Sequence, residues 1–332
     1  MQKPKIKRFI MLIFLFILTF LASGMIYIND WTGISNCVTE KEIVMARSIG
    51  FRLSRTGIPW AGIEIKYWNK HWFWEEPDNL VLQHKNRHID ILYVLAFTPW
   101  WASSGGDYKS PFESNDYMYY PPKDIKDWEN FIRKIAIRYK GLIKMWEIWN
   151  EPDTEFFWRG SVEEYKELVE SAYKTLKEVD SESTVVLGGL ALSDPGDGKF
   201  NPDFLEEFLK LGGGNFVDVI SFHIYCNQKE TLKDKVRYIK RLFKKYNINK
   251  KIWITELGCS TATHTEEEQS EFIMKSLKES SELGIEKVFI YRLEDIEEDE
   301  EWESRLGILR RDFSYKKIIY KLWNFLHSGI ID

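Results

Sequence analysis

The chain has 332 residues, of which 44% are hydrophobic, 29% are charged and 15% are aromatic, and its formal net charge at pH 7 is −5. This balance is that of a soluble globular enzyme, and the acidic charge argues against nucleic acid as a partner. The three cysteines, Cys37, Cys226 and Cys259, exclude a disulfide-dense scaffold and lack the spacing of a zinc site.

The N-terminus has the layout of an export signal. Four basic residues within the first eight precede an apolar run over residues 9–22, in which Thr19 is the one polar side chain. Small side chains at 22–24 suit cleavage, whereas continuation of the apolar run to residue 28 gives roughly 20 residues, enough to span a bilayer. We therefore expect residues 1–24 to form a signal peptide or a signal anchor, and the protein to be secreted or held at the cell surface by a transmembrane segment.

After this segment, short β-rich apolar runs alternate with longer amphipathic segments. The predicted strands, in chain order, are residues 25–28, 50–55, 89–97, 143–149, 184–189, 217–225, 251–255 and 287–291. Helical patterns lie between or after them at residues 124–139, 161–179, 266–283 and 315–326. The second of these helices opens with Ser161-Val162-Glu163-Glu164, the arrangement of a capping box. An acidic run over residues 297–303 is interpreted as a solvated loop.

Eight strands that alternate with helices predict an α/β fold, a parallel sheet closed into a (β/α)8 TIM barrel. The strands lack strict polar alternation, which fits a sheet buried on both faces. No repeat, low-complexity tract or proline-rich linker indicates a second domain. Residues 25–332 are therefore expected to form one domain.

Two glutamates end predicted strands of this barrel. Glu151 follows the fourth strand in Trp-Glu-Ile-Trp-Asn-Glu-Pro, and Glu256 ends the seventh in Trp-Ile-Thr-Glu. Barrel enzymes carry their chemistry at the C-terminal ends of the strands. Two carboxylates across a barrel mouth suit glycosidic cleavage, in which one protonates the leaving oxygen and the other attacks the anomeric carbon. Glu147 lies four residues before Glu151 on the same strand, so its side chain points to the same side. We interpret it as the buried partner of an inward arginine.

These motifs resemble the acid/base and nucleophile motifs of glycoside hydrolase clan A, above all those of family 39 and of family 5-like members. The resemblance covers nearly the whole chain after the N-terminal segment. It includes Arg55 with Trp60, the sixth strand Phe222-His223-Ile224-Tyr225, and the closing Gly307-Ile308-Leu309 with Asp312 and Lys316. One departure stands out: related enzymes commonly carry tryptophan where Ile290 stands, although Tyr291 is retained. Whether Tyr291 supplies the missing sugar platform stays open.

The resemblance implies a retaining double displacement on a β-linked oligo- or polysaccharide. Glu256 is expected to act as the nucleophile, and Glu151 as the general acid and then the base, its pKa raised by the charge of Glu256. Arg55 and Tyr225 are expected to hydrogen-bond Glu256, and Asn150 to donate to the sugar 2-hydroxyl. Neither a metal nor a cofactor is required.

Several further residues are candidates for contact with the carbohydrate, and most of them also have a purely structural interpretation. His223 is either a substrate contact or a satisfied core histidine. Trp100 and Trp101 are either sugar platforms or loop anchors, and Trp158 is either part of an outer subsite or aromatic packing. The remaining candidates are Trp60 and Tyr291.

Three questions stay open at this level. A transglycosylase would use the same intermediate, and a non-catalytic carbohydrate-binding barrel would keep the aromatic residues. Cys226 and Cys259, each after a predicted strand end, form either a disulfide or two free thiols. The sugar and the oligomeric state are not specified by the sequence.

Overall fold

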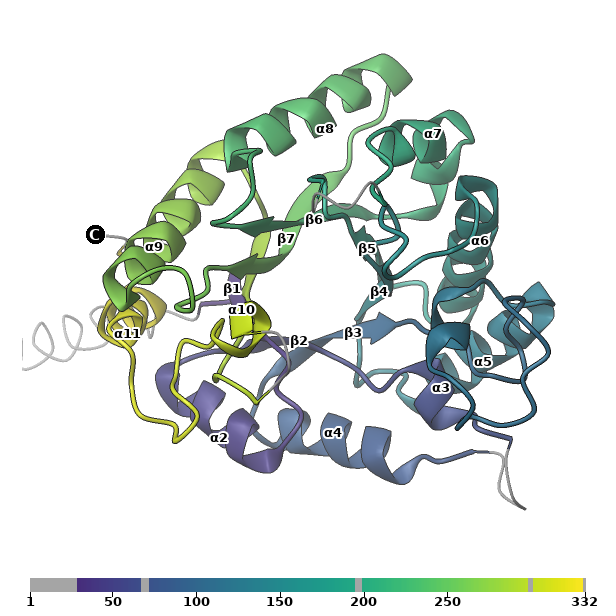
Figure 1. Ribbon diagram of the computed structural model, residues 1–332, viewed down its shortest axis with the longest axis horizontal. Helices are drawn as coiled ribbons and strands as arrows, with labels where there is room; N and C mark the ends of the chain where they lie inside the picture. The colour runs from purple at the N-terminus through teal and green to yellow at the C-terminus, as the bar shows by residue number, and fades with distance from the viewer. Residues whose placement is uncertain (1–28, 67–71, 195–198, 298–300, 331–332) are drawn as a thin grey trace, which may run out of the picture.

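The computed structural model describes residues 29–66, 72–194, 199–297 and 301–330. Eight parallel strands close into a barrel in the order of the sequence, with β8 paired to β1 (Figure 1). The strands are β1 (Thr32–Ser35), β2 (Leu53–Thr56), β3 (Asp90–Leu95), β4 (Met145–Asn150), β5 (Thr184–Gly189), β6 (Val219–Tyr225), β7 (Lys251–Gly258) and β8 (Lys287–Ile290). The predicted TIM barrel is confirmed.

Helices surround this barrel and connect successive strands (Figure 1). They are α2 (Glu40–Ile49), α3 (Trp60–Ile63), α4 (Glu75–Asn86), α5 (Ile125–Arg138), α6 (Val162–Val179), α7 (Phe204–Lys210), α8 (Leu232–Tyr246), α9 (Glu266–Leu283), α10 (Glu301–Ser304) and α11 (Ile318–Ser328), with 3-10 turns at Asp116–Tyr119 and Gly213–Phe216. The predicted capping box of α6 is confirmed, because the Ser161 hydroxyl accepts from the Glu164 N–H and the Glu164 carboxylate accepts from the Ser161 N–H.

The first strand was predicted in the wrong place. Residues 25–28 lie outside the described part of the chain, and β1 is Thr32–Ser35, which pairs with β2 and β8. This strand reads Thr-Gly-Ile-Ser, so it has one large apolar side chain although all four residues are buried. Apolar character therefore pointed to the wrong segment. None of the helices in the described residues is long and apolar enough to cross a membrane.

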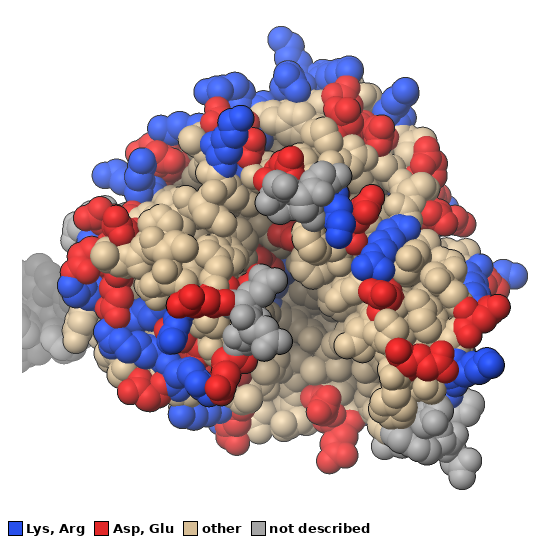
Figure 2. Space-filling view, in the orientation of Figure 1, with Lys and Arg blue, Asp and Glu red and all other residues tan. Residues whose placement is uncertain are grey.

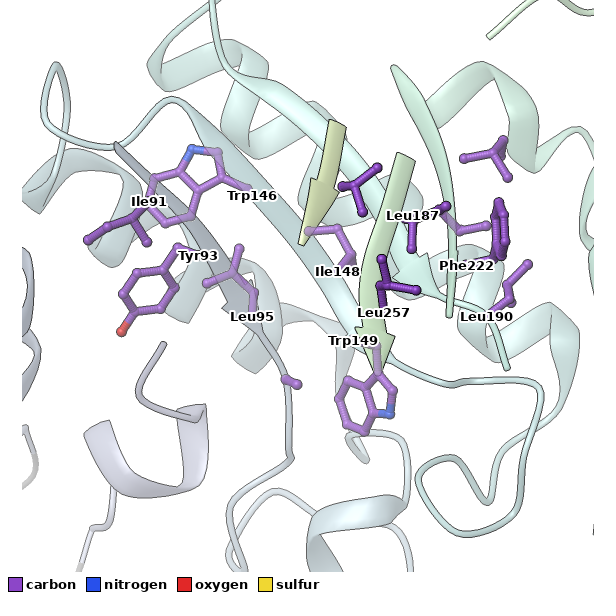
Figure 3. Close-up of a cluster of buried hydrophobic side chains, with 14 of the residues drawn as sticks. Ile91, Tyr93, Leu95, Trp146, Ile148, Trp149, Leu187, Leu190, Phe222 and Leu257 are labelled. Atoms are coloured by element: carbon purple, nitrogen blue, oxygen red, sulfur yellow. The ribbon is translucent and has the colours of Figure 1, made fainter. Parts of the chain in front are cut away.

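The barrel has two hydrophobic layers. The larger lies between the sheet and the helices, and Figure 3 shows part of it on β3 and β4, including Ile91, Tyr93 and Ile148. The smaller fills the barrel interior with Leu53, Leu92, Val186, Val219, Trp253 and Phe289. Beyond this interior layer, the next inward side chains toward the C-terminal ends are polar, beginning with Arg55, Glu147 and Ser221. An apolar floor thus supports a polar layer at the mouth.

Candidate active site

A change in backbone conformation at the end of β4 turns Glu151 toward the barrel mouth. Trp149 and Glu151 have φ values of 77° and 41°, in the left-handed region that larger side chains rarely adopt. The Trp149 indole consequently packs in the outer hydrophobic layer, where its N–H donates to the Phe157 carbonyl at 2.7 Å (Figure 3). The Glu151 side chain stays 17% exposed. Backbone strain of this kind, about 1–3 kcal/mol per residue, is concentrated at functional sites.

A β-bulge in β7 turns Glu256 inward. Trp253 points into the barrel interior, so strict alternation would turn Thr255 inward and Glu256 toward the helices. Instead β7 contains one extra residue relative to both β6 and β8 in this region, and the register shifts. The bulge directs the buried Glu256 carboxylate to the polar layer, where it contacts Arg55 and Tyr225.

Arg55 of β2 links three residues of this layer. Its Nε donates to Glu147 Oε2 at 2.5 Å, its Nη1 to Glu256 Oε1 at 2.6 Å, and its Nη2 to Asn150 Oδ1 at 2.7 Å. Burial alone would lower the pKa of Arg55, but the carboxylates of Glu147 and Glu256 outweigh burial and raise it. Arg55 therefore remains charged, and Glu147 is its buried partner, as predicted.

His223 of β6 lies between the two candidate catalytic carboxylates. Its Nδ1 is 2.7 Å from Glu151 Oε1 and 3.4 Å from Glu256 Oε2. One potential ligand atom from each of the three residues lies within 4.8 Å of the other two. A side chain on Gly189 would put its Cβ 2.1 Å from His223 Nε2, so the glycine makes the room that the imidazole needs. Burial lowers the pKa of His223 to about 4, which keeps the ring neutral at neutral pH.

The other Glu256 oxygen accepts from Tyr225. The Tyr225 hydroxyl donates to Glu256 Oε2, while Arg55 occupies Oε1. Glu256 is thus fixed as an oriented carboxylate by one cation and one neutral donor. Asn150 accepts from Arg55 through its oxygen, which leaves its amide nitrogen as a donor.

Burial raises the pKa of Glu151 to about 7, and Lys235 and Arg55 oppose this shift. The direction agrees with the expectation, but the cause differs: burial, and not the charge of Glu256, is responsible. Lys235 was missed in the sequence. It lies on the buried face of α8, and its ammonium donates to the carbonyls of Ala191 at 2.5 Å and His223 at 2.8 Å. A lysine within the apolar stripe of an amphipathic helix was the available signal.

Two predicted carbohydrate contacts lie away from the carboxylates. Trp60 is 0% exposed, donates to Glu64 at 2.9 Å and stacks on Phe131. Trp158 is 2% exposed, donates to the Ser161 carbonyl, and borders a cavity of about 560 Å³ whose lining includes residues of α6 and α7. Both indoles are packed inside the protein, and a sugar-contacting role for Trp60 or Trp158 remains a prediction.

Trp100 and Trp101 anchor the loop after β3. Their indole N–H groups donate to the carbonyls of Ile65 and Glu64, each at 2.7 Å. The Lys66 ammonium covers one face of the Trp101 ring at 3.0 Å from its centre. Their anchoring role is therefore established, and a sugar-contacting role for either residue remains a proposal.

The structure explains the aliphatic residue at the end of β8. Phe289 points into the barrel interior and Ile290 into the outer layer, so Tyr291 occupies the next inward position. Its ring lies 6.1 Å from that of Tyr225. Tyr225 also contacts Trp302 of α10, with ring centres 5.3 Å apart. Trp302 lies within the acidic run, and its sequence context does not indicate a residue of the barrel mouth.

A disulfide joins the segments that follow β6 and β7. Cys226 and Cys259 are bonded with a Cα–Cα distance of 5.1 Å, whereas Cys37 is a buried free thiol. His264 lies near this pair, but disulfide sulfurs are not thiolates and do not ligate a metal as thiolates do. Among the described residues, the other group with metal-ligand spacing is Glu151, His223 and Glu256, in which His223 is paired with Glu151, and Glu256 with Arg55 and Tyr225.

The geometry agrees with a comparison to known families. Residues 68–301 match the model of the glycosyl hydrolase catalytic core, a span that contains Glu151, His223, Tyr225 and Glu256. The chain belongs to this family. The expected resemblance to clan A glycoside hydrolases, and to family 39 in particular, is confirmed.

Individual relatives of this glycosyl hydrolase are distant. A β-xylosidase from Caldicellulosiruptor saccharolyticus is 34% identical over 139 residues, which is 40% of this chain but only 26% of that protein's length. A family 39 glycoside hydrolase from Bacteroides cellulosilyticus has a TM-score of 0.71 at 20% identity, over 91% of this chain and 64% of the other. A monomeric β-xylosidase from Caulobacter crescentus has a TM-score of 0.69 at 16% identity, over 90% and 68%. The structural matches establish the fold.

Proposed function

We propose that this chain is a retaining β-glycosidase in which Glu151 is the acid/base and Glu256 the nucleophile. One observation carries the proposal: a carboxylate oxygen of Glu151 and one of Glu256 lie within 4.8 Å of each other across the barrel mouth. Retaining glycosidases have carboxyl groups about 5–5.5 Å apart, whereas inverting enzymes leave about 6.5–9.5 Å for a water molecule. The presence of both carboxylates favours catalysis over a purely carbohydrate-binding role.

In the first step, a Glu256 oxygen attacks the anomeric carbon and forms a glycosyl ester. The bond to the leaving oxygen breaks, and that oxygen takes the proton of Glu151. Arg55 and Tyr225 hold the Glu256 carboxylate in position before the attack. The amide nitrogen of Asn150 is available to donate to the sugar 2-hydroxyl, a contact that strengthens in the transition state.

In the second step, ionised Glu151 takes a proton from water, whose oxygen attacks the anomeric carbon and releases Glu256. Neutral His223 suits both steps when its Nδ1 carries the proton, because Nδ1–H then donates to Glu151 Oε1 whether Glu151 is protonated or ionised, and the acid proton stays on Oε2 for the leaving oxygen. The contact therefore orients Glu151 in both protonation states.

The first substrates to test are aryl β-xylosides. The sequence relative at 34% identity is a β-xylosidase, and a structural neighbour shares that description. Other β-linked sugars belong in the same screen, because specificity depends on loops that differ between members of one fold.

Export also belongs to the proposal. The Cys226–Cys259 disulfide supports it, because disulfides persist mainly in oxidising compartments. N-terminal sequencing of the protein from membrane and culture fractions distinguishes a cleaved signal from an anchor. Recovery of the protein only from the cytosol with an intact N-terminus would contradict export.

Azide rescue tests the two catalytic assignments separately. Glu256→Ala should lower kcat at least about 10⁴-fold, because the covalent step is lost. Azide should then enter the vacated space, attack the substrate directly and yield the α-glycosyl azide. Glu151→Ala with azide should instead yield the β-glycosyl azide, because azide attacks the glycosyl-enzyme in place of water.

The matched control is Glu155→Ala, which removes an exposed carboxylate four residues from Glu151. It should retain wild-type kcat and give no azide product. Nuclear magnetic resonance of the products assigns each anomer. Full activity of Glu256→Ala, or the same azide anomer from both variants, would contradict the assignment.

A further inference from the structure

Lys235 is a buried cation, and no carboxylate of the described residues lies within ion-pair distance of its nitrogen. It belongs to the inner face of α8 and is 2% exposed. In Figure 2, most of the lysines and arginines lie toward the edge of the face, around the hollow of the barrel mouth. Burial of a charge is unfavourable unless hydrogen bonds and nearby opposite charges compensate for the loss of water. The contacts of Lys235 show what compensates.

The Lys235 ammonium holds three neutral acceptors. It donates to the carbonyls of Ala191 at 2.5 Å and His223 at 2.8 Å, and to Gln228 Oε1 at 2.7 Å. Three acceptors around one nitrogen favour the charged form, because a neutral amine has only two hydrogens to donate. Ala191 follows β5, His223 lies on β6 and Gln228 follows β6. One side chain thus joins the ends of two neighbouring strands.

Two routes of contact lead from these acceptors to Glu151. Through the side chain, His223 Nδ1 lies 2.7 Å from Glu151 Oε1. Through the backbone, Asp153, two residues after Glu151, accepts from the Ala191 N–H at 3.0 Å. Both routes end at Lys235, which holds the carbonyls of Ala191 and His223. The side chain and the backbone of Glu151 are therefore held in one closed ring of contacts.

Gln228 extends the same network toward the other carboxylate. Its Oε1 also accepts from the Tyr225 N–H at 3.0 Å, and the Tyr225 hydroxyl donates to Glu256. Lys235 itself contacts neither Glu151 nor Glu256 and is shielded from solvent. It can therefore act on the reaction only through other residues and through its charge.

The charge of Lys235 favours the ionised form of Glu151. Burial raises the pKa of Glu151 to about 7, and Lys235 is the first of the charges that oppose this shift. Burial also lowers the pKa of Lys235 to about 7 and raises that of Asp153 to about 7. Because the three groups act on one another, removing one charge changes the protonation of the others. The further titratable or charged groups that face this set are Glu230 after β6, His223 on β6 and Arg55 on β2.

We propose that Lys235 is a positioning residue for the second step, in which its ammonium stabilises ionised Glu151 and orients this base through His223. In that step Glu151 has to be an anion before it takes a proton from water. The inference rests on the proposed function, because it takes Glu151 to be the acid/base.

Carbon-13 nuclear magnetic resonance of protein labelled at the glutamate carboxyl carbons measures the ionisation of Glu151 with or without turnover. Glu151→Gln identifies the resonance by its loss. In Lys235→Met, the Glu151 titration should move to higher pH, because a neutral side chain no longer favours the carboxylate. Gln228→Glu should move it in the same direction, because a carboxylate against the ammonium offsets its charge. The second variant keeps Lys235 and an acceptor oxygen, so it decides the matter even if Lys235→Met does not fold.

Kinetics with 2,4-dinitrophenyl β-xyloside separates the second step from the first. This leaving group needs no proton, so the second step should limit kcat. At pH 6, Lys235→Met should lower kcat about three- to tenfold and change kcat/KM less than about twofold. Azide needs no general base and should restore kcat. A purely structural role predicts that kcat/KM falls as well and that azide restores nothing.

The matched control is Lys233→Met, two residues earlier on α8, where the lysine is 56% exposed and pairs with Glu279 at 3.5 Å. It should leave both the titration and kcat at their wild-type values. An unchanged Glu151 titration in folded Lys235→Met or in Gln228→Glu would overturn the inference. A wild type in which Glu151 titrates but no β-glycoside is hydrolysed would contradict the proposed function and leave the comparison of titrations intact.

Discussion

Glu151 has to donate a proton in one half of the proposed reaction and accept one in the other. A pKa of about 7 suits both roles near neutral pH, and burial in the barrel mouth supplies the shift. The charges of Lys235 and Arg55 oppose this shift, and burial lowers the pKa of Lys235 itself to about 7. The pKa of Glu151 is thus set by burial together with two positive charges, and not by one partner.

This pKa predicts the alkaline limb of the pH profile. Glu151 must be protonated to assist departure of a poor leaving group, so kcat/KM should fall as the pH rises through about 7. A 2,4-dinitrophenyl glycoside needs no proton for its departure and should lack this limb. Initial rates between pH 5 and 9 with both substrates provide the measurement. An equal decrease in kcat/KM at alkaline pH with both substrates would contradict the assignment of this limb to Glu151.

Residue types at strand ends allowed much of the polar layer to be predicted. Glu151, Glu256, Arg55, Asn150 and Tyr225 are brought together, and Glu147 pairs with the arginine as its strand parity indicates.

The burial of the aromatic residues could not be predicted. Tryptophan serves core packing and sugar binding equally well, so the sequence did not show that Trp60 and Trp158 are buried. The acidic neighbours of Trp302 likewise suggested solvent exposure.

At the scale of elements, local irregularities build the site. The bulge in β7 and the left-handed residues after β4 both depart from ideal strand geometry, and both direct a carboxylate into the mouth. Seven of the eight strands could be predicted from runs of apolar residues, but neither irregularity leaves a clear mark in the sequence. Strict alternation of side chains along β7 would even have predicted that Glu256 points away from the pocket.

The disulfide between the segments after β6 and β7 should stabilise this part of the barrel. It closes a loop with a sequence separation of 33 residues, so loop-closure entropy predicts a loss of about 3–4 kcal/mol in unfolding free energy for the Cys226→Ser, Cys259→Ser double variant. Guanidinium unfolding under oxidising conditions measures the change. Wild type with dithiothreitol should match the variant. A difference below about 1 kcal/mol would mean that the bond adds little beyond the strand pairing already present.

For the whole molecule, alternation of strands and helices was sufficient to predict the barrel and its single mouth. A closed parallel barrel brings all strand ends to one face, so residues at these ends converge although they are far apart in the sequence. The proposed export segment lies outside the described residues, and the sugar specificity depends on loops whose conformation the sequence does not encode in a simple pattern. Those two properties therefore remain proposals.

Covalent trapping tests the central assignment most directly. The enzyme is incubated with 2,4-dinitrophenyl 2-deoxy-2-fluoro-β-xyloside, in which the fluorine slows both steps and the good leaving group lets the first proceed. Mass spectrometry of the digested protein should find one fluoroxylosyl group, attached to Glu256 within Lys251–Gly258. A label on Glu151, or no label on an enzyme that hydrolyses β-xylosides with inversion, would contradict the account.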